Sequence, residues 1–570
     1  MSEMISGAEG LIKSLLSEGV DMVFGYPGGA IISVYDKLFD YQDKIRHILV
    51  RHEQGAIHAA QGYARITGRP GVVIVTSGPG AANVVTGLSD ALMDSTPLVV
   101  ISGQVASAFL GTDAFQETDV VAMTQQITKW AIQIRRPEDI PDAVARAFYI
   151  ASTGRPGPVV LDIAKDAQIG MMEWQHKTCD YIRSYNPMPH VDSADVLEVA
   201  ELLNNAKHPL ILSGHGVAIS NAEEELLQIA QTADIPVAAT LLGLSTINSD
   251  VPQYKGMLGM HGNIGPNIAT NKADVILALG MRFDDRVTGD AKKYALAPKI
   301  IHVDIDPSEL NKNIKVFKAI NADAKSFLSS LALFIKPNKH DEWNKLFEQC
   351  DKVEYDEVIM PEVHPNSGKM KMGEVVNAVT KAAGKGAVCV TDVGQNQMFA
   401  SRYFKYSAPK SFISSGGLGT MGFGLPAAIG ASMGAPDRTI CLFVGDGGLQ
   451  MTIQELGTIM EHGAKVKIVL LNNNFLGNVR QWQTLFFHSR YSQTHMLNPD
   501  FVALAAAYAI PGEDVTSRED LPAAIDRMLS HDGTYLLNVD IDASDMIFPM
   551  IPAGGTVDNI MLNENKKFSL

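Results

Sequence analysis

Short apolar runs alternate with amphipathic, helix-like stretches along most of the chain. Up to about residue 170 these runs are Met22–Phe24, Val72–Val75 and Leu98–Ile101. Apolar runs of strand length that alternate with helical patterns are typical of βαβ units, whose neighbouring strands are parallel. This part of the chain therefore predicts an α/β block with a parallel sheet.

The same alternation occurs in two further blocks. The strands that we expect there are Leu210–Leu212, Val237–Ala239, Val275–Leu279 and Ile300–Ile305 in the second block, and Ala387–Thr391, Ile440–Val444 and Lys467–Leu471 in the third. The chain is therefore predicted to be an α/β protein with three doubly wound parallel sheets.

Two segments between the blocks lack apolar periodicity. Residues from about 175 to 192 contain Pro187 and Pro189, and residues from about 336 to 368 are polar and also contain proline. Both segments are interpreted as linkers. The expected domains are residues 1–175, 192–336 and 369–545, followed by a tail at 546–570.

One short pattern occurs in both the first and the third block. Residues 59–62 (AAQG) precede a proline, an apolar strand and the turn Gly78–Gly80, and residues 427–430 (AAIG) precede a proline, an apolar strand and the turn Gly445–Gly447. A single match of this kind can arise by chance. It nevertheless favours one fold for both blocks.

Composition narrows the class of protein. With 570 residues, 47 Lys plus Arg and 63 Asp plus Glu, the chain has a formal net charge of −16. An acidic balance argues against nucleic-acid binding. Four cysteines without paired or zinc-type spacing indicate reduced thiols in a cytosolic protein. The acidic N-terminal stretch does not resemble a secretory signal, and no apolar run predicts a membrane span.

The strongest chemical signal is the pair formed by Asp446 and Asn473. Asp446 follows one predicted strand, and Asn473 follows the next, after an intervening helical stretch. A helix of ten residues covers ~15 Å and a short strand returns ~16–20 Å, which brings both residues to the carboxyl edge of one sheet. Carboxylate and amide oxygens suit Mg²⁺. Two unrelated Asx turns are the plainer alternative.

Motifs along almost the whole chain resemble the catalytic large subunit of the acetohydroxyacid synthase (acetolactate synthase) family of thiamine-diphosphate enzymes. They are FGYPGGA (24–30), RHEQGA (51–56), VTSGPGA (75–81), GTDAFQE (111–117), GRPGPVVLDIAKD (154–166), LGMHG (258–262), GMRFDDRVTG (280–289), GGLGTMGFGLPAA (416–428), GDGGLQMT (445–452) and NNNFLGNVRQWQ (472–483). The resemblance implies a pyrimidine-binding first domain, a central FAD-binding domain and a diphosphate-binding third domain.

By this resemblance, Glu53 contacts the pyrimidine ring of thiamine diphosphate and assists the proton transfer that activates the cofactor. Taken alone, Glu53 would be read as a carboxylate favoured by a helix N-terminus. In the family, the pyrimidine and diphosphate ends of the cofactor are held by different subunits. A homodimer, or a tetramer built from dimers, is therefore implied.

The resemblance also implies the other cofactor contacts. For thiamine diphosphate these are Glu53, Val393, Gly394, Gln395, Asn396, Gly419, Met421, Asp446, Gly447, Gly448, Asn473 and Gly477, with Mg²⁺ bound by Asp446, Asn473 and the backbone carbonyl of Phe475. For FAD they are Arg155, Gly214, His215, Gly216, Thr240, Leu241, Gly259, Met260, His261, Gly280, Arg282, Asp284, Arg286, Asp304, Ile305, Asp323 and Ala324. From the residues alone, Arg282 and Arg286 could equally pair with Asp284 and Asp285.

Substrate handling is implied for a further group. Gly29, Phe115, Gln116 and Lys165 match the catalytic set of the family, and Trp482 and Arg282 match its substrate contacts. A backbone N–H, an amide or an ammonium group can stabilise an alkoxide that develops during attack on a carbonyl. For Trp482, simple core packing is the alternative interpretation.

The chain departs from the family pattern at two motifs. Asn478 stands where the family usually has Met, and GQNQMF (394–399) replaces the usual GQHQMW, with Asn396 for His and Phe399 for Trp. An amide at 396 can still donate a hydrogen bond to a phosphate. Asn478 instead changes the polarity of the expected substrate pocket and leaves the preferred acceptor open.

The implied reaction joins pyruvate, after loss of CO₂, to a second pyruvate or to 2-ketobutyrate, as in branched-chain amino acid biosynthesis. The alternatives are a flavin enzyme like pyruvate oxidase, which Lys165, Gln116 and Trp482 disfavour, and a simple 2-keto acid decarboxylase, whose paired histidines are missing from this sequence. A catalytically inactive homologue is disfavoured because Glu53 and Asp446 are both present. The family also implies a separate regulatory small subunit.

Overall fold

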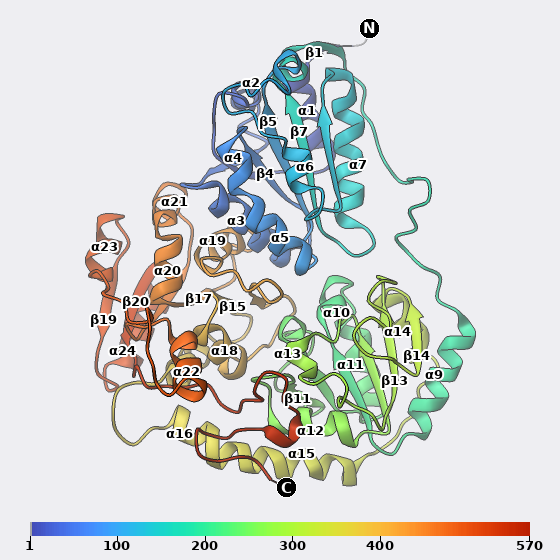
Figure 1. Ribbon diagram of the computed structural model, residues 1–570, viewed down its shortest axis with the longest axis vertical. Helices are drawn as coiled ribbons and strands as arrows, with labels where there is room; N and C mark the ends of the chain where they lie inside the picture. Colours follow the sequence, from blue (N-terminus) through green and yellow to red (C-terminus); the bar gives the residue numbers. More distant parts are fainter. Residues whose placement is uncertain (1–2, 570) are drawn as a thin grey trace.

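The computed structural model describes residues 3–569, and its framework is three six-stranded sheets (Figure 1). All strand pairs within these three sheets are parallel, and helices connect most of the successive strands. Three doubly wound α/β sheets, as predicted, are therefore confirmed. In the view of Figure 1 the first block lies at the top, the second at the lower right and the third at the lower left. Within residues 3–569, no helix has both the length and the apolar character required to cross a membrane.

The first sheet has the order β3 (Arg46–Leu49), β2 (Met22–Gly25), β4 (Gly71–Val75), β5 (Leu98–Gln104), β7 (Pro158–Ala164), β6 (Trp130–Ile134). Its helices are α1 (Gly7–Ser17), α2 (Ile32–Asp40), α3 (Glu53–Thr67), α4 (Pro79–Asn83), α5 (Val85–Met93), α6 (Val120–Thr124), α7 (Ile140–Ser152) and α8 (Lys165–Ile169). Every residue of β4, β5 and β7 is buried, as expected for central strands covered on both faces. A separate antiparallel pair, β1 (Met4–Ser6) with β8 (Met171–Glu173), joins the two ends of the block.

The third sheet has the order β16 (Phe412–Ile413), β15 (Val388–Thr391), β17 (Ile440–Gly445), β18 (Lys467–Asn472), β20 (Tyr535–Asp540), β19 (Gly512–Val515). Its helices are α17 (Met372–Ala383), α18 (Gln395–Tyr403), α19 (Gly424–Gly434), α20 (Asp446–Met451), α21 (Leu456–His462), α22 (Gly477–Phe486), α23 (Phe501–Ala507) and α24 (Leu521–Ser530). When the strands of each block are numbered along the chain, the first and third sheets share the order 2-1-3-4-6-5. The two blocks have one fold, as the repeated AAQG and AAIG pattern suggested.

The second sheet differs in topology. Its order is β11 (Tyr254–Met257), β10 (Val237–Ala239), β9 (Pro209–Ser213), β12 (Val275–Leu279), β13 (Lys299–Asp304), β14 (Lys318–Asn321). Its helices are α9 (Ser193–Asn205), α10 (His215–Ile219), α11 (Glu223–Thr232), α12 (Ile264–Lys272), α13 (Asp285–Thr288) and α14 (Ala324–Ala332). Numbered along the chain, the order is 3-2-1-4-5-6, which is the order of dinucleotide-binding sheets.

The two predicted linkers have different structures. Residues 174–192 form neither helix nor strand, as expected. Most of residues 336–368, the second predicted linker, are helical and form α15 (Asp341–Glu354), a π-helical turn (Tyr355–Ile359) and α16 (Met360–Val363). Three buried apolar residues recur at helical spacing in this segment, namely Trp343, Phe347 and Cys350. The segment is therefore polar overall but has one apolar face that packs against the core.

The tail after residue 545 packs on the second block. Met550, Ile551, Ile560 and Leu562 share a buried cluster with residues of α12 and α15. The backbone N–H of Ile551 donates to the carbonyl of Met260 at 2.8 Å. The tail is therefore part of the folded framework.

Helices α3 and α19 hold the first and third blocks together, and they approach each other unusually closely (Figure 1). A Cβ atom added to Gly62 would lie 2.0 Å from the carbonyl oxygen of Ala427, and one added to Gly430 would lie 1.8 Å from that of Ala59. These residues belong to the two repeated AAQG and AAIG segments, which contact each other reciprocally. Glycine is required on both helices because backbone atoms, which cannot move aside, occupy the space of a side chain.

We expect Gly62→Ala and Gly430→Ala each to destabilise the protein, because the added methyl group overpacks a contact between two backbones. The cost should be roughly 1–3 kcal/mol or more, measured as a lower midpoint of thermal unfolding. Gly10→Ala in α1 is the matched control, since its nearest neighbour would be the flexible end of the Met172 side chain. Equal stability of all three variants would contradict this account of the contact.

Candidate functional site

The candidate residues of the first block lie at the carboxyl edge of its sheet. Gly29 follows β2, Glu53 follows β3 and opens α3, Gln116 lies in the segment after β5, and Lys165 directly follows β7. Because the strands are parallel, these positions share one edge, which is where open α/β sheets bind ligands.

Glu53 is half-buried at this edge. Its Oε2 accepts a hydrogen bond from Nδ2 of Asn83 at 2.9 Å. Gly80, at the start of α4, leaves the other oxygen accessible, since a Cβ there would lie 3.3 Å from Oε1. The carboxylate is thus oriented by one amide and keeps an oxygen for another partner.

The segment around Gln116 has an uncommon backbone. Gln116 has φ +60° and Asp113 has φ +56°, and Gln116 packs against Gly78, which also has a positive φ. Such conformations cost energy in residues other than glycine and are frequent in functional loops. Phe115 is 88% exposed, Lys165 is exposed and Gln116 is half-buried. In a single chain these side chains are therefore accessible to a ligand or to a second chain.

In the third block, Asp446 and Asn473 follow the neighbouring parallel strands β17 and β18, in which Gly445 pairs with Leu471. Both side chains are buried. The Oδ1 atom of Asn473 accepts from the N–H of Phe475 at 3.1 Å, while its Nδ2 has no hydrogen-bond partner among the described residues. Burial raises the pKa of Asp446, which a nearby cation would offset.

This donor set fits a hard cation. In residues 3–569 no group of three His, Cys, Asp or Glu side chains could hold a metal ion. One carboxylate, one amide oxygen and a backbone carbonyl are oxygen donors of the kind that Mg²⁺ uses when phosphate and water complete its coordination.

Asn498 was missed by sequence reasoning. Its Nδ2 donates to Oδ2 of Asp446 at 2.7 Å and lies 2.9 Å from Oδ1 of Asn472 and 3.2 Å from Oδ1 of Asn474. Gln450 in turn donates to its Oδ1 at 3.0 Å. A single amide group thus orients the Asp446 carboxylate. Nothing in the local sequence pattern indicates this role, because the contact spans 52 positions.

Asp392, at the end of β15, was also missed. It is fully buried, and its carboxylate accepts hydrogen bonds from the backbone N–H groups of Val393, Gly422 and Gly424. A Cβ on Gly448 would lie 2.4 Å from its Oδ1. This carboxylate therefore joins the loops that contain Val393 and Met421 to the first turn of α20, where Gly448 lies. An acidic residue directly after a buried apolar strand was the available signal.

Two predicted cofactor contacts have side chains that are engaged within the protein. Gln395 donates to Oε1 of Gln481 at 3.1 Å and to the carbonyl of Asp545 at 2.9 Å. Asn396 donates to the carbonyl of Phe443 at 3.0 Å. Hydrogen bonds from positions 395 and 396 to a phosphate would thus come chiefly from their backbone N–H groups at the start of α18.

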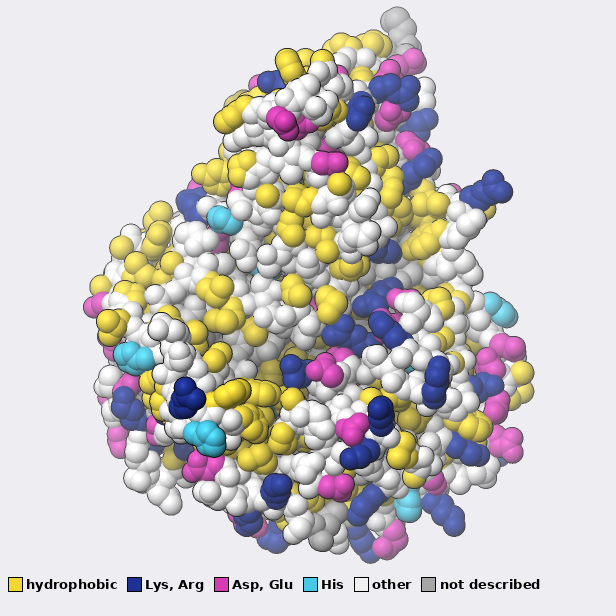
Figure 2. Space-filling model, in the orientation of Figure 1, with side chains coloured by type: hydrophobic (Ala, Val, Ile, Leu, Met, Phe, Trp, Pro, Cys, Tyr) yellow, Lys and Arg dark blue, Asp and Glu magenta, His cyan; other side chains and the backbone are white. Residues whose placement is uncertain are grey.

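A cavity of about 740 Å³ lies where the three blocks meet. It is lined by all the predicted FAD contacts except Gly214 and Gly259, and also by Val393, Gly394, Gly419, Asn478 and Trp482. This volume is in the upper part of the range of ligand sites. Basic side chains gather at the junction of the first and second blocks in Figure 2, and Arg155, Arg282 and Arg286 line the cavity.

The glycine turns in and next to the cavity wall are suited to binding a dinucleotide. Gly214, Gly216 and Gly280 come from the ends of β9 and β12, the two strands between which the order of the second sheet reverses. A Cβ on Gly214 would lie 2.2 Å from the carbonyl oxygen of Gly280, so the two turns pack without side chains. Burial raises the pKa of Asp304, at the end of β13, to about 7. A carboxyl group at this position can accept a hydrogen bond from a ribose hydroxyl.

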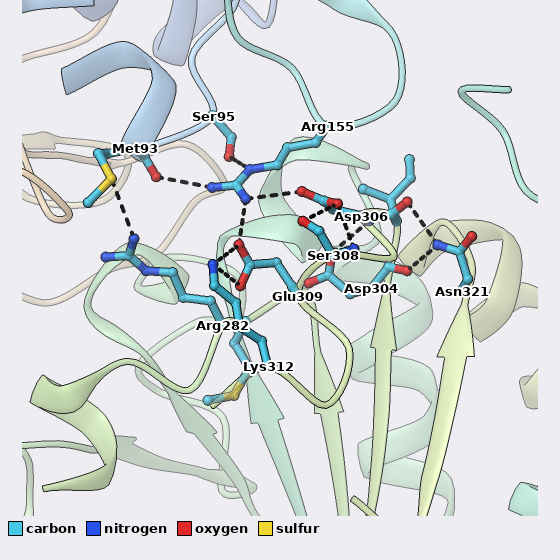
Figure 3. Close-up of polar contacts among 12 residues, drawn as sticks. Met93, Ser95, Arg155, Arg282, Asp304, Asp306, Ser308, Glu309, Lys312 and Asn321 are labelled. Carbon is cyan, nitrogen blue, oxygen red and sulfur yellow. Dashed lines mark hydrogen bonds and ion pairs between the residues drawn. The ribbon is translucent and has the colours of Figure 1, made fainter. Parts of the chain in front are cut away.

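Arg155 connects the first block to the second (Figure 3). Its guanidinium group contacts Asp306 at 3.2 Å and Glu309 at 2.8 Å, and its Nε donates to Ser95 at 2.8 Å. Most of its donors are therefore used in holding the wall of the cavity. If Arg155 contacts FAD directly, as the sequence predicts, the contact would have to come from its Nη2 atom. This atom makes only a long hydrogen bond of 3.4 Å, to the carbonyl of Met93.

Buried hydrogen bonds and an ion pair hold the loop after β16 against the first block. Asp94 accepts from the N–H groups of Gly416 at 2.9 Å and Gly417 at 2.7 Å, and it pairs with Arg65 at 2.8 Å. The neighbouring Asp90 accepts from Thr420 at 3.0 Å, and burial raises its pKa to about 6. The position of this loop in the cavity wall thus depends on residues from the first block.

Among residues 3–569, no hydrogen bond or ion pair links Glu53 to Asp446. The carboxylate of Glu53 accepts from Asn83, and that of Asp446 accepts from Asn498 and from the N–H of Gly447, in each case within its own block. Neither residue lines the central cavity. The two predicted ends of the thiamine diphosphate site are therefore described as two half-sites, one in each block.

Comparisons with known proteins give a consistent result. Three family models match: the N-terminal TPP binding domain of thiamine pyrophosphate enzymes at residues 5–123, their central domain at 196–331 and their C-terminal TPP binding domain at 392–539. The chain is 42% identical over 555 residues to the acetolactate synthase isozyme 2 large subunit of Escherichia coli, covering 97% of this chain and 98% of that protein. It is 40% identical over 573 residues to the acetolactate synthase large subunit of Haemophilus influenzae, covering 98% of each. It is 41% identical over 568 residues to a probable acetolactate synthase large subunit of Methanocaldococcus jannaschii, covering 98% and 95%.

We expect Asn498→Ala to weaken divalent cation binding, because it removes the amide that orients Asp446. The loss should be roughly 10- to 100-fold, as for other residues that orient metal ligands. Manganese affinity, followed by electron paramagnetic resonance at fixed thiamine diphosphate, measures it. Asn205→Ala, at the exposed end of α9, serves as the control. Unchanged affinity in Asn498→Ala would exclude this role for Asn498.

Proposed function

The chain belongs to the thiamine pyrophosphate enzymes and is homologous to their acetolactate synthase large subunits, and from this we propose that it is a thiamine-diphosphate-dependent carboligase with acetolactate synthase activity. In this reaction one pyruvate loses CO₂ and its remaining two-carbon unit is joined to a second 2-keto acid. Pyruvate as acceptor gives 2-acetolactate, and 2-ketobutyrate gives 2-aceto-2-hydroxybutyrate. Both products belong to branched-chain amino acid biosynthesis.

One observation supports this assignment above the others. Two sheets of the same strand order carry complementary half-sites at their carboxyl edges, a free carboxylate oxygen in the first and a hard-cation donor set in the third. Thiamine diphosphate needs both, since its pyrimidine nitrogen requires a hydrogen-bonding carboxyl group and its diphosphate requires a cation. Domains 1–175 and 369–545 would hold these two ends.

Several residues fit the cofactor by their surroundings. Asp446, Asn473 and the carbonyl of Phe475 would hold Mg²⁺, and the N–H groups of Gly447 and Gly448 open α20 beside it. Gly419 has φ +73°, which permits close approach of its backbone, and a Cβ on Gly447 would lie 3.7 Å from Cε of Met421. Gly477 abuts Gln395 in the same region.

When bound, thiamine diphosphate supplies a carbon nucleophile and an electron sink for decarboxylation. Glu53 would hold a hydrogen bond to the pyrimidine ring and thereby govern where the cofactor keeps its protons. Gln116, Lys165 and the N–H of Gly29 would donate to the keto oxygen as it becomes an alkoxide. Arg282 would bind the acceptor carboxylate, and Trp482 would form an apolar wall beside it.

The second domain, residues 192–336, would bind FAD. Its dinucleotide-type strand order, its paired glycine turns and the acidic group at Asp304 all support this. The net reaction transfers no electrons to an acceptor, so the flavin would be mainly structural. An oxidase like pyruvate oxidase would instead require the flavin to be reduced in each turnover.

A complete active site would need a second copy of the chain. No hydrogen bond or ion pair links Glu53 to Asp446 among the described residues, and large apolar side chains are exposed in the segments near both half-sites, namely Phe115 (88%), Met451 (56%), Phe487 (59%) and Leu497 (91%). Figure 2 shows apolar side chains gathered around α22 in the third block. A homodimer, in which each Glu53 faces the Asp446 of its partner, would cover them. A regulatory small subunit and a cytoplasmic location are further parts of this proposal.

We expect Glu53→Gln to reduce acetolactate formation roughly 100-fold or more, because the amide cannot act as an acid or a base toward the ring. The initial rate of product formation from pyruvate measures this. The same variant should keep wild-type flavin content and thermal stability, because Glu53 makes only one side-chain hydrogen bond within residues 3–569. Near-normal turnover would exclude the role assigned to Glu53.

Subunit mixing tests the shared site. Glu53→Gln and Asp446→Ala chains, each inactive alone, should regain activity when they are co-expressed with different tags and purified as mixed assemblies. In a twofold-symmetric dimer one of the two sites of each heterodimer is intact, so the purified heterodimers should have about half of the wild-type activity. No recovery in purified heterodimers would show that each site lies within one chain.

A further inference from the structure

The irregular linker between the first and second blocks, residues 174–192, is attached to the first block at the end of α7. Figure 1 shows this linker descending from the first block to α9 along the right-hand edge of the molecule. The hydroxyl of Tyr185 donates to the carbonyl of Thr153 at 2.7 Å and lies 3.1 Å from the Thr153 hydroxyl. Tyr185 also packs edge-on against Tyr149 of α7, with ring centroids 5.9 Å apart. Part of the linker is therefore fixed rather than a free tether.

Lys129, which precedes β6, binds the same corner of the first block. Its Nζ donates to the carbonyls of Ile150 and Thr153, the latter at 2.8 Å, and to the hydroxyl of Tyr185 at 3.2 Å. The ammonium group lies 5.6 Å from the centre of the Tyr185 ring. Cationic side chains commonly bind the last carbonyls of a helix in this way. Here the same cation also holds the linker.

The residues after Tyr185 continue along the wall of the central cavity. A Cβ added to Gly154 would lie 3.5 Å from Cα of Pro187, so the loop after α7 contacts the linker. Gly154 and Met188 both line the cavity, and Met188 is 57% exposed. An accessible apolar side chain on the wall of a large cavity is available to a ligand.

The linker lies at one end of this cavity. The cavity follows the carboxyl edge of the second sheet, since its lining includes Thr240 after β10, Gly280 after β12 and Ala324 after β14. Strands β10 and β14 are four strand spacings apart, or about 19 Å. Figure 3 shows Arg155, from the loop after α7, reaching Asp306 beside the ends of β13 and β14. This loop and the linker therefore close the β14 end.

The opposite end belongs to the third block. Gly419 and Trp482 line the cavity, and the third block packs on the other edge of the sheet, where Ala239 of β10 and Met257 of β11 share its buried cluster. A ligand that fills the cavity must therefore be long. FAD, which the proposed function assigns to this domain, has an aromatic ring system at each end. One of its two rings then lies beside Met188, whose thioether suits an aromatic neighbour.

Resting on that proposed function, we propose that linker residues 185–188 are part of the dinucleotide-binding site and that the Met188 side chain packs against one terminal ring of FAD. The ring removes the exposed apolar surface of Met188 from water, which stabilises the bound state. Tyr185 and Lys129 are positioning residues, because they hold the segment but do not line the cavity.

Titration of the full-length, flavin-depleted protein with FAD tests the contact. We expect Met188→Ser to raise the Kd of FAD about tenfold, because the ring loses its apolar neighbour, while Met188→Leu keeps an affinity near that of wild type. Met171→Ser is the matched control, since Met171 is 58% exposed, lies just before the same linker and does not line the cavity. Without FAD all three variants should unfold at the wild-type temperature, because both methionines are exposed.

Two fragments of FAD identify the ring in direct titrations. FMN carries the flavin ring and ADP the adenine ring, and Met188→Ser should weaken one of them about tenfold and leave the other unchanged. An equal loss for both fragments would indicate an altered cavity and would overturn the contact with one terminal ring.

The rate of FAD release after dilution tests the attachment of the linker. Tyr185→Phe removes the hydroxyl that donates to Thr153, and we expect about fivefold faster release, the effect of one neutral hydrogen bond. Tyr181→Phe is the control, since Tyr181 lies in the same linker and is 72% exposed. Unchanged release in Tyr185→Phe would exclude Tyr185 as a positioning residue.

The titration separates this inference from the proposed function. If the wild type binds FAD and Met188→Ser binds it equally well, the inference alone is overturned. If the wild type does not bind FAD, the flavin-binding domain of the proposed function is refuted together with the inference. If the wild type binds FAD but forms no acetolactate, the proposed activity is refuted, and the Kd of Met188→Ser still decides on the linker.

Discussion

Two helices whose backbones nearly touch, α3 and α19, determine how the first and third blocks are oriented. The contact is possible only because Gly62 and Gly430 each leave room for a carbonyl oxygen of the facing helix. Interlocked backbones tolerate neither sliding nor rotation, in contrast to a contact between long side chains. The two carboxyl edges, and the half-sites on them, are therefore fixed relative to each other by the fold itself.

Buried polar groups then make this arrangement specific. Glu455, from the segment before α21, is fully buried and accepts hydrogen bonds from the N–H of Arg51 at 3.2 Å and from Thr458 at 2.6 Å. Asp94 plays the same part for the loop after β16. Each of these carboxylates binds backbone N–H groups of another segment, so a shifted arrangement would leave a buried charge unpaired, which is costly. Under the proposed homodimer, this rigidity would hold each half-site in place for the facing half-site of a second chain.

Much of this could be predicted from the sequence because buried strands leave a strong local signal. The apolar runs at Val237–Ala239 and Val275–Leu279 match their strands to the residue, and central strands such as β4 and β17 were located within one residue. The edge strands β6 and β19 are only partly buried, and β16 has two residues, so their patterns are weak. The strand order of the second sheet could not be predicted, because the sequence lacks the G-x-G-x-x-G motif that usually marks dinucleotide-binding sheets. Here Gly214 packs closely against Gly280 instead.

Contacts between distant segments account for what sequence reasoning missed at the candidate site, and they also determine which departures from the family pattern have consequences. Asn396 and Asn478 both replace a residue usual in the family, and both are amides near the same cavity. The amide of Asn396 lies inside the third block and donates to the carbonyl of Phe443, so its burial is compensated within the chain. The Oδ1 atom of Asn478 is buried without a hydrogen-bond partner among the described residues, so the cost of its burial is not compensated within the chain. Of these two amides, only the one at position 396 is therefore accommodated by hydrogen bonds of the surrounding fold.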